Sequence, residues 1–153
     1  MPTDTEIEPQ ALRGLDALAQ RDVRRRHIEK IVARAGLSLS AAAAWLLVRL
    51  EEDACLEPDI LARSRGIEPE ILRRALLELS NQELIVERPC DHRNEPGQQL
   101  TTKGCEIFNR LVAARREHLA ELWPEWSPEK REEAASVIRR LAQQIVPETK
   151  LKG

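Results

Sequence analysis

Apolar residues recur every three or four positions through the first third of the chain, the spacing of one face of an α-helix. This pattern predicts a long helix over 10–36 that ends at Gly36. Ser40 then offers a hydroxyl cap to a second helix, which is apolar nearly all round and should lie in the core. Residues 1–9 are polar and acidic with two prolines, so we expect a flexible tail there.

In the centre of the chain the pattern changes to two short helices separated by a glycine. Gly66 follows the first helix and can take the left-handed conformation of a tight turn. Pro69 begins the second, where a missing N–H costs little. Ala62 and Leu72 supply the small and large apolar residues that allow two helices to cross closely. The order predicts a helix-turn-helix.

A β-hairpin is expected directly after these helices. Two short runs of strand-forming residues, 84–88 and 98–101, flank the turn formers of 89–97. Thr101 then offers its hydroxyl as the N-cap of a further helix. A strand, a polar tip and a second strand after a helix-turn-helix predict a winged helix over residues 40–104.

The C-terminal part is predicted to hold two more helices. The first runs over 102–123 and is interrupted by Pro124. The sequence Ser127-Pro128-Glu129 is a strong start signal for the second, which ends at Pro147. These helices carry more apolar face than a small winged helix can cover, so we expect a second copy of the chain to bury it about a two-fold axis. The alternative is that they fold back on their own domain.

The predicted fold class is therefore mainly α with a minor β part. A length of 153 residues suits one domain, and the abundance of Leu, Ala, Glu and Arg favours helices. The expected organisation is a single domain over 10–146, with a winged helix at 40–104, dimerisation helices at 10–36 and 102–146, and tails at 1–9 and 147–153.

No stretch of the chain predicts export or membrane insertion. The longest apolar run, residues 41–48, is too short to span a bilayer, and the N-terminus is acidic. Three cysteines, Cys55, Cys90 and Cys105, are odd in number and far apart, which argues against a disulfide framework and suits a reducing cytosol. A cytoplasmic protein is expected.

Two further kinds of cysteine chemistry are open. Cys90 or Cys105 could be a redox switch, because a thiol near the wing would couple oxidation to DNA release. Cys90 and His92 have metal-ligand spacing, but two ligands do not make a tetrahedral site, and we predict no metal.

Charge gives a mixed indication about nucleic acid. The net charge is −2, and residues 56–104 contain seven Lys or Arg against nine Asp or Glu. Glu68 and Glu70 stand at the start of the helix that would enter the major groove. They either stabilise the helix N-terminus through its dipole or indicate that this chain binds DNA weakly.

Short motifs at fixed places complete the pattern of the central region. They are Leu61-Ala62 with Gly66-Ile67, Arg74 and Leu79, Leu84-Ile85 with Arg88, Asp91-x-Arg93, and Leu100-Thr101-x-x-Gly104. Together they resemble the MarR family of winged-helix transcription regulators, and flanking helices extend the resemblance over most of residues 10–146. Glu83 stands where the family usually has glycine. The resemblance implies a homodimer, paired through its N- and C-terminal helices, that binds double-stranded DNA at a pseudo-palindromic site.

Eight residues are the candidates for DNA contact. Arg73 and Arg74 lie on the predicted recognition helix, where a guanidinium can fork onto guanine or phosphate. The resemblance implies that Arg93 enters the minor groove from the wing, held by Asp91. Contacts to the DNA backbone are expected from Arg63, Arg65, Arg88 and Lys103.

Trp45, His118 and Trp123 are the candidates for an effector pocket, because family members commonly sense a small molecule between the dimer helices and the winged lobe. Each could instead be a core residue. No catalytic motif is present, so we predict neither an enzyme nor a cofactor. The predicted function is transcription regulation. The alternative is a winged-helix protein-interaction module with weak or no DNA binding, related to the soluble tails of some multidrug-efflux transporters.

Overall fold

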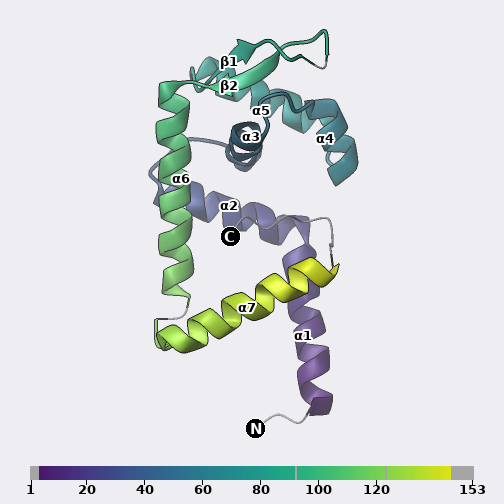
Figure 1. Cartoon of the computed structure of the whole chain (residues 1–153), viewed down its shortest axis with the longest axis vertical. Helices are drawn as coiled ribbons and strands as arrows, with labels where there is room; N and C mark the ends of the chain where they lie inside the picture. Colours follow the sequence, from purple (N-terminus) through teal and green to yellow (C-terminus); the bar gives the residue numbers. More distant parts are fainter. Residues whose placement is uncertain (1–3, 92, 123, 146–153) are drawn as a thin grey trace. The chain divides into compact units, whose positions relative to one another are not determined.

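The computed structural model describes residues 4–91, 93–122 and 124–145, and these are mainly helical with one two-stranded sheet (Figure 1). The predicted fold class is confirmed. The chain divides into two compact units, Met1–Arg115 and Arg116–Gly153, where the sequence predicted a single domain over 10–146. The helix-turn-helix and the wing both lie in the first unit.

The N-terminal helix predicted over 10–36 is two helices. α1 spans Asp4–Ala19 and α2 spans Arg21–Arg34, and they are separated by an extended backbone at Gln20 (φ −67°, ψ 133°). α1 begins inside the segment expected to be a tail, and it tolerates Pro9 at the loss of one backbone hydrogen bond. Helical spacing alone did not reveal the break, because apolar residues continue at similar intervals on both sides of it.

α3 (Ala41–Glu52) is the centre of the core, as predicted. Leu46, Leu47 and Leu50 are fully buried, and the surrounding cluster includes residues of α2, α5, β1 and α6. The Ser40 hydroxyl accepts from the N–H of Ala43, which confirms the predicted cap. It also donates to Glu78 of α5 over 2.6 Å, so the start of α3 is tied to the recognition helix.

The helix-turn-helix consists of α4 (Pro58–Arg65) and α5 (Pro69–Asn81). Gly66 lies between them in the left-handed conformation (φ 61°). The N–H of Ile67 donates a hydrogen bond of 2.8 Å to the carbonyl of Ala62. Ala62 and Leu72 are buried where the two helices meet. This turn is the one predicted, since its geometry depends on residues adjacent in sequence.

The wing is formed by β1 (Ile85–Arg88) and β2 (Gly97–Leu100), which pair antiparallel from Ile85 with Leu100 to Arg88 with Gly97. In Figure 1 it lies beside α5. Glu83 precedes it with a positive φ of 59°. That conformation favours glycine, the residue the resemblance places there.

Two further helices follow the wing. α6 spans Thr102–Glu121, and the Thr101 hydroxyl accepts from the N–H of Gly104 as its cap. α7 spans Pro128–Ile145, with the Ser127 hydroxyl accepting from the N–H of Lys130. Both predicted starts are confirmed. Across the described ranges, no helix combines the length and the apolar character needed to cross a membrane.

Candidate nucleic-acid interface

The exposed face of α5 is the surface that a helix-turn-helix offers to DNA. The opposite face of the helix is buried in the core through Leu72, Ala75 and Leu79. Arg73 and Arg74 therefore lie outside, with side chains 60% and 80% exposed. Helical spacing predicted this division, because residues three or four apart share a face.

Both of these arginines are paired with carboxylates. Arg73 lies 3.3 Å from Asp59 of α4 and 3.8 Å from Glu70, and the Nε of Arg74 lies 3.3 Å from Glu70. Exposed pairs of this kind are worth roughly 0.2–1 kcal/mol each. The arginines can therefore leave their partners for phosphate, but at a cost to affinity. Of the two acids noted at the start of this helix, only Glu70 forms a recorded ion pair with them.

The four residues predicted to contact the DNA backbone lie around the helix-turn-helix. Arg63 and Arg65 are exposed in the last turn of α4, where Arg63 donates to the carbonyl of Asp59. Arg88 is exposed at the end of β1. Lys103 donates from Nζ to the carbonyl of Gln82 over 3.0 Å, which links the start of α6 to the end of α5.

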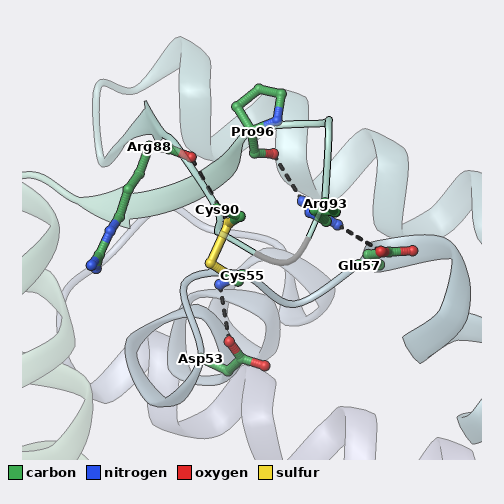
Figure 2. Close-up of polar contacts among 7 residues, drawn as sticks. All are labelled: Asp53, Cys55, Glu57, Arg88, Cys90, Arg93 and Pro96. Atoms are coloured by element: carbon green, nitrogen blue, oxygen red, sulfur yellow. Dashed lines mark hydrogen bonds and ion pairs between the residues drawn. A yellow bond between two sulfur atoms is a disulfide. The ribbon is translucent and has the colours of Figure 1, made fainter.

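Arg93 is held differently from the prediction. Its guanidinium lies 3.4 Å from Glu57, not against Asp91, and it donates to the carbonyl of Pro96 over 2.8 Å (Figure 2). The side chain is 15% exposed, and its Nε is buried with no hydrogen-bond partner among the described residues. Asp91 is exposed. The expected partner was wrong because the wing loop turns toward the segment before α4.

A disulfide between Cys55 and Cys90 joins the same two segments (Figure 2). Their Cα atoms are 5.8 Å apart across a sequence separation of 35 residues. This overturns the argument against disulfide bonding, and with it the cysteine argument for a reducing compartment. Only Cys105 is a free thiol, and it is exposed.

The start of β2, at the loop end of the wing, approaches the segment after α3 very closely. The N–H of Gln98 donates to the carbonyl of Ala54 over 2.8 Å. A Cβ on Gly97 would overlap that carbonyl oxygen and the sulfur of Cys90, so only glycine fits there. Sequence reasoning assigned Gly97 to a turn and did not mark Glu57 at all. No residue next to Gly97 or Glu57 in the sequence marked this contact.

The residues predicted to line an effector pocket belong to different parts of the chain. Trp45 is half-buried in the first unit, and the guanidinium carbon of Arg49 lies 5.8 Å from its ring centroid, within cation–π range. His118 is half-buried in the second unit. Trp123 lies outside the described residues. The pocket remains a prediction.

The cysteine at the wing is not available as a metal ligand, since it forms the disulfide, and its predicted partner His92 lies outside the described residues. The part of the chain that the structure describes contains no group of three or more His, Cys, Asp or Glu placed to hold a metal ion.

Similarity to known proteins is seen only at the level of structure. No family model matches the sequence, and no curated protein matches it. A solved structure of MarR superposes with a TM-score of 0.67 at 21% identity, covering 89% of this chain and 91% of the other. A MarR transcriptional regulator from Methanosarcina mazei gives 0.67 at 14% identity, covering 91% and 99%. The MarR family protein Rv2887 of Mycobacterium tuberculosis, solved with salicylic acid, gives 0.61 at 19%, covering 78% and 88%. The fold is that of MarR-like winged-helix regulators.

Proposed function

We propose that this chain is a DNA-binding transcription regulator that acts in the cytoplasm as a homodimer on a pseudo-palindromic operator. The observation that carries the proposal is the exposed face of α5, where Arg73 and Arg74 project from a helix-turn-helix whose other face is buried. The likeness to solved MarR regulators supports it.

In this proposal α5 enters the major groove. Arg73 and Arg74 exchange their carboxylate partners for phosphate or guanine, which a guanidinium can contact through two donors. Four exposed cations hold the DNA backbone on either side: Arg63, Arg65, Arg88 and Lys103. The wing reaches the minor groove, where Arg93 acts only after leaving Glu57, and Asp91 borders the contact.

The terminal helices supply the argument for a dimer. Leu12, Leu15 and Leu18 are exposed on α1, and Val137, Ile138 and Leu141 are exposed on α7. A second copy would bury these apolar stripes about a two-fold axis. The two recognition helices would then meet successive major grooves, about 34 Å apart.

Charge placed within the α7 stripe tests the dimer. Ile138→Glu should convert a dimer to a monomer in sedimentation velocity, because the carboxylate would be buried at the contact. Ser136→Glu adds the same charge on the opposite side of α7 and should leave the dimer intact. A monomeric wild-type protein, or equal effects of the two variants, would contradict this part of the proposal.

DNA binding is tested across salt concentration. Duplex DNA from the region upstream of the protein's own coding sequence should bind with a log affinity that falls linearly with log salt. Arg74→Ala should make that slope shallower by about one unit, because one phosphate contact is lost. Arg140→Ala on α7 removes an exposed arginine outside the proposed interface and should leave the slope unchanged.

A small aromatic acid is the proposed effector class. Trp45 offers an aromatic face with Arg49 beside it, a combination that suits a ring bearing a carboxylate. Rv2887 was solved with salicylic acid. Titration with salicylate should quench tryptophan fluorescence and weaken DNA binding, and Trp45→Phe should remove most of the quenching. Quenching of equal size in that variant would exclude Trp45.

The second candidate function is a protein-interaction module. It is favoured by an open groove between α5 and β1, lined by Leu76, Leu77, Ile85 and Val86 among others, in which Leu77 and Val86 are exposed apolar residues. Such a module would show neither a specific DNA complex nor a salt slope. The DNA titration above therefore separates the two functions.

A further inference from the structure

Three bonds hold the wing against the segment between α3 and α4. The disulfide Cys55–Cys90 and the ion pair Glu57–Arg93 hold the loop, and we call these two bonds together the wing clamp. The main-chain bond from Gln98 to Ala54 holds the start of β2 separately. Breaking the disulfide would leave the loop held by the Glu57–Arg93 ion pair, while the bond from Gln98 to Ala54 keeps the start of β2 in place.

The wing loop that carries Cys90 and Arg93 is open to solvent on one side. The wing loop folds around an open hollow of about 440 Å³, lined by Glu87, Arg88, Pro89, Cys90, Arg93, Asn94, Glu95 and Pro96. Arg93 follows Cys90 in a turn in which the N–H of Arg93 contacts the carbonyl of Cys90 at 3.4 Å. The position of the cysteine thus sets the position of the arginine.

We propose that the Cys55–Cys90 pair is a reversible redox site that controls whether Arg93 reaches DNA. This inference rests on the proposed function. In the oxidised form the clamp keeps Arg93 turned to Glu57 and largely buried, so the wing is withheld from the minor groove. In the reduced form the loop moves away, the ion pair with the half-buried Glu57 breaks, and Arg93 adds one contact to DNA.

A dithiol protein is the reductant that the site would take. Its thiolate attacks the sulfur of the half-buried Cys55, the S–S bond breaks, and Cys90 leaves as a thiolate that takes a proton. The second thiol of the reductant then displaces Cys55, which is also protonated. Two electrons and two protons pass to the regulator, and the reductant becomes a disulfide.

A peroxide is the matching oxidant. The thiolate of Cys55 attacks one oxygen of hydrogen peroxide, which gives a sulfenic acid and releases hydroxide. The thiol of Cys90 then attacks that sulfur, the S–S bond forms, and water leaves. Cys55 is placed for the first step because Cys90 is only 8% exposed.

The test compares oxidised and reduced protein in a Cys105→Ser background, which removes the exposed third thiol. Reduction by thioredoxin, as the dithiol probe, should tighten binding to the upstream duplex and steepen the log–log salt slope by about one unit. Cys55→Ser/Cys90→Ser should behave as reduced under both conditions. Arg93→Ala should bind equally in both redox states, and Glu57→Gln should tighten binding of the oxidised form.

A second measurement does not depend on DNA. Amide hydrogen exchange over residues 89–96 should accelerate on reduction, while exchange in α5 stays the same. A disulfide that thioredoxin cannot reduce in the folded protein, or a loop whose exchange does not change, would overturn the redox site. A redox difference in affinity that persists in Arg93→Ala would overturn the role of Arg93. Absence of DNA binding in both states, with faster exchange on reduction, would refute the proposed function and leave the redox site standing.

Discussion

Glu70 is the residue whose replacement should most strengthen DNA binding. Among the described residues it is the only ion-pair partner of Arg74, at 3.3 Å, and one of two partners of Arg73, at 3.8 Å. Its side chain is 56% exposed, so the pairs are solvent-screened. At roughly 0.2–1 kcal/mol each, two such pairs cost about 1 kcal/mol to break, or about fivefold in affinity.

Glu70→Gln should therefore bind duplex DNA about fivefold more tightly than a matched control at the same salt. Its log–log salt slope should be steeper by about one unit, because Arg74 becomes free to neutralise a phosphate. Glu68→Gln is that control. It removes the same charge from the same helix start, but Glu68 forms no recorded ion pair with either arginine.

Fluorescence anisotropy at a series of salt concentrations measures both quantities. The substitution also removes an acid from the first turn of α5, at a cost of about 0.3–1 kcal/mol in helix stability, so binding is compared well below the melting temperature. Equal affinities and slopes for Glu70→Gln and Glu68→Gln would refute the reasoning. That result would mean that the ion pairs with Glu70 do not keep Arg73 and Arg74 from binding DNA.

Three further predictions concern stability, and denaturant unfolding measures all of them. Glu83→Gly should raise the free energy of unfolding by up to about 1 kcal/mol. The left-handed conformation costs a residue with a side chain about 1–2 kcal/mol, and the greater backbone entropy of glycine in the unfolded chain cancels about 0.5–1 kcal/mol of the gain. A lower free energy of unfolding in the variant would refute the strain at Glu83. Gly104→Ala should lower the free energy of unfolding by about 1–3 kcal/mol, because its Cβ would overlap the carbonyl of Leu84. Gly14→Ala, at a helix position with open space around it, should raise the free energy of unfolding by about 0.5–1 kcal/mol. A Gly104→Ala variant more stable than Gly14→Ala would contradict this. Ser40→Ala should cost roughly 0.5–2 kcal/mol through the lost cap, and no change would show that the cap is dispensable.

Elements specified by neighbouring residues could be predicted from the sequence. Gly66 and Pro69 mark the turn and the start of the recognition helix, and Thr101 and Ser127 mark two later helix starts. Each signal depends on backbone geometry within a few residues, so it needs no knowledge of the rest of the chain. The buried face of α5 followed in the same way, and with it the exposure of Arg74.

Contacts between segments distant in sequence could not be predicted. The break at Gln20 has no glycine or proline to mark it, and spacing cannot distinguish two helices in succession from one. The ion pair of Arg73 with Asp59 depends on how α4 and α5 cross. The effector pocket stays a prediction.

The sequence by itself determined the helix-turn-helix, the hairpin, the caps and the face of α5 that carries its arginines, because these follow from local periodicity and backbone preference. The tertiary structure alone decided that Cys55 meets Cys90 and that Arg93 meets Glu57. Both contacts depend on where two loops come to lie after the core around α3 has packed, and no short-range pattern records that position.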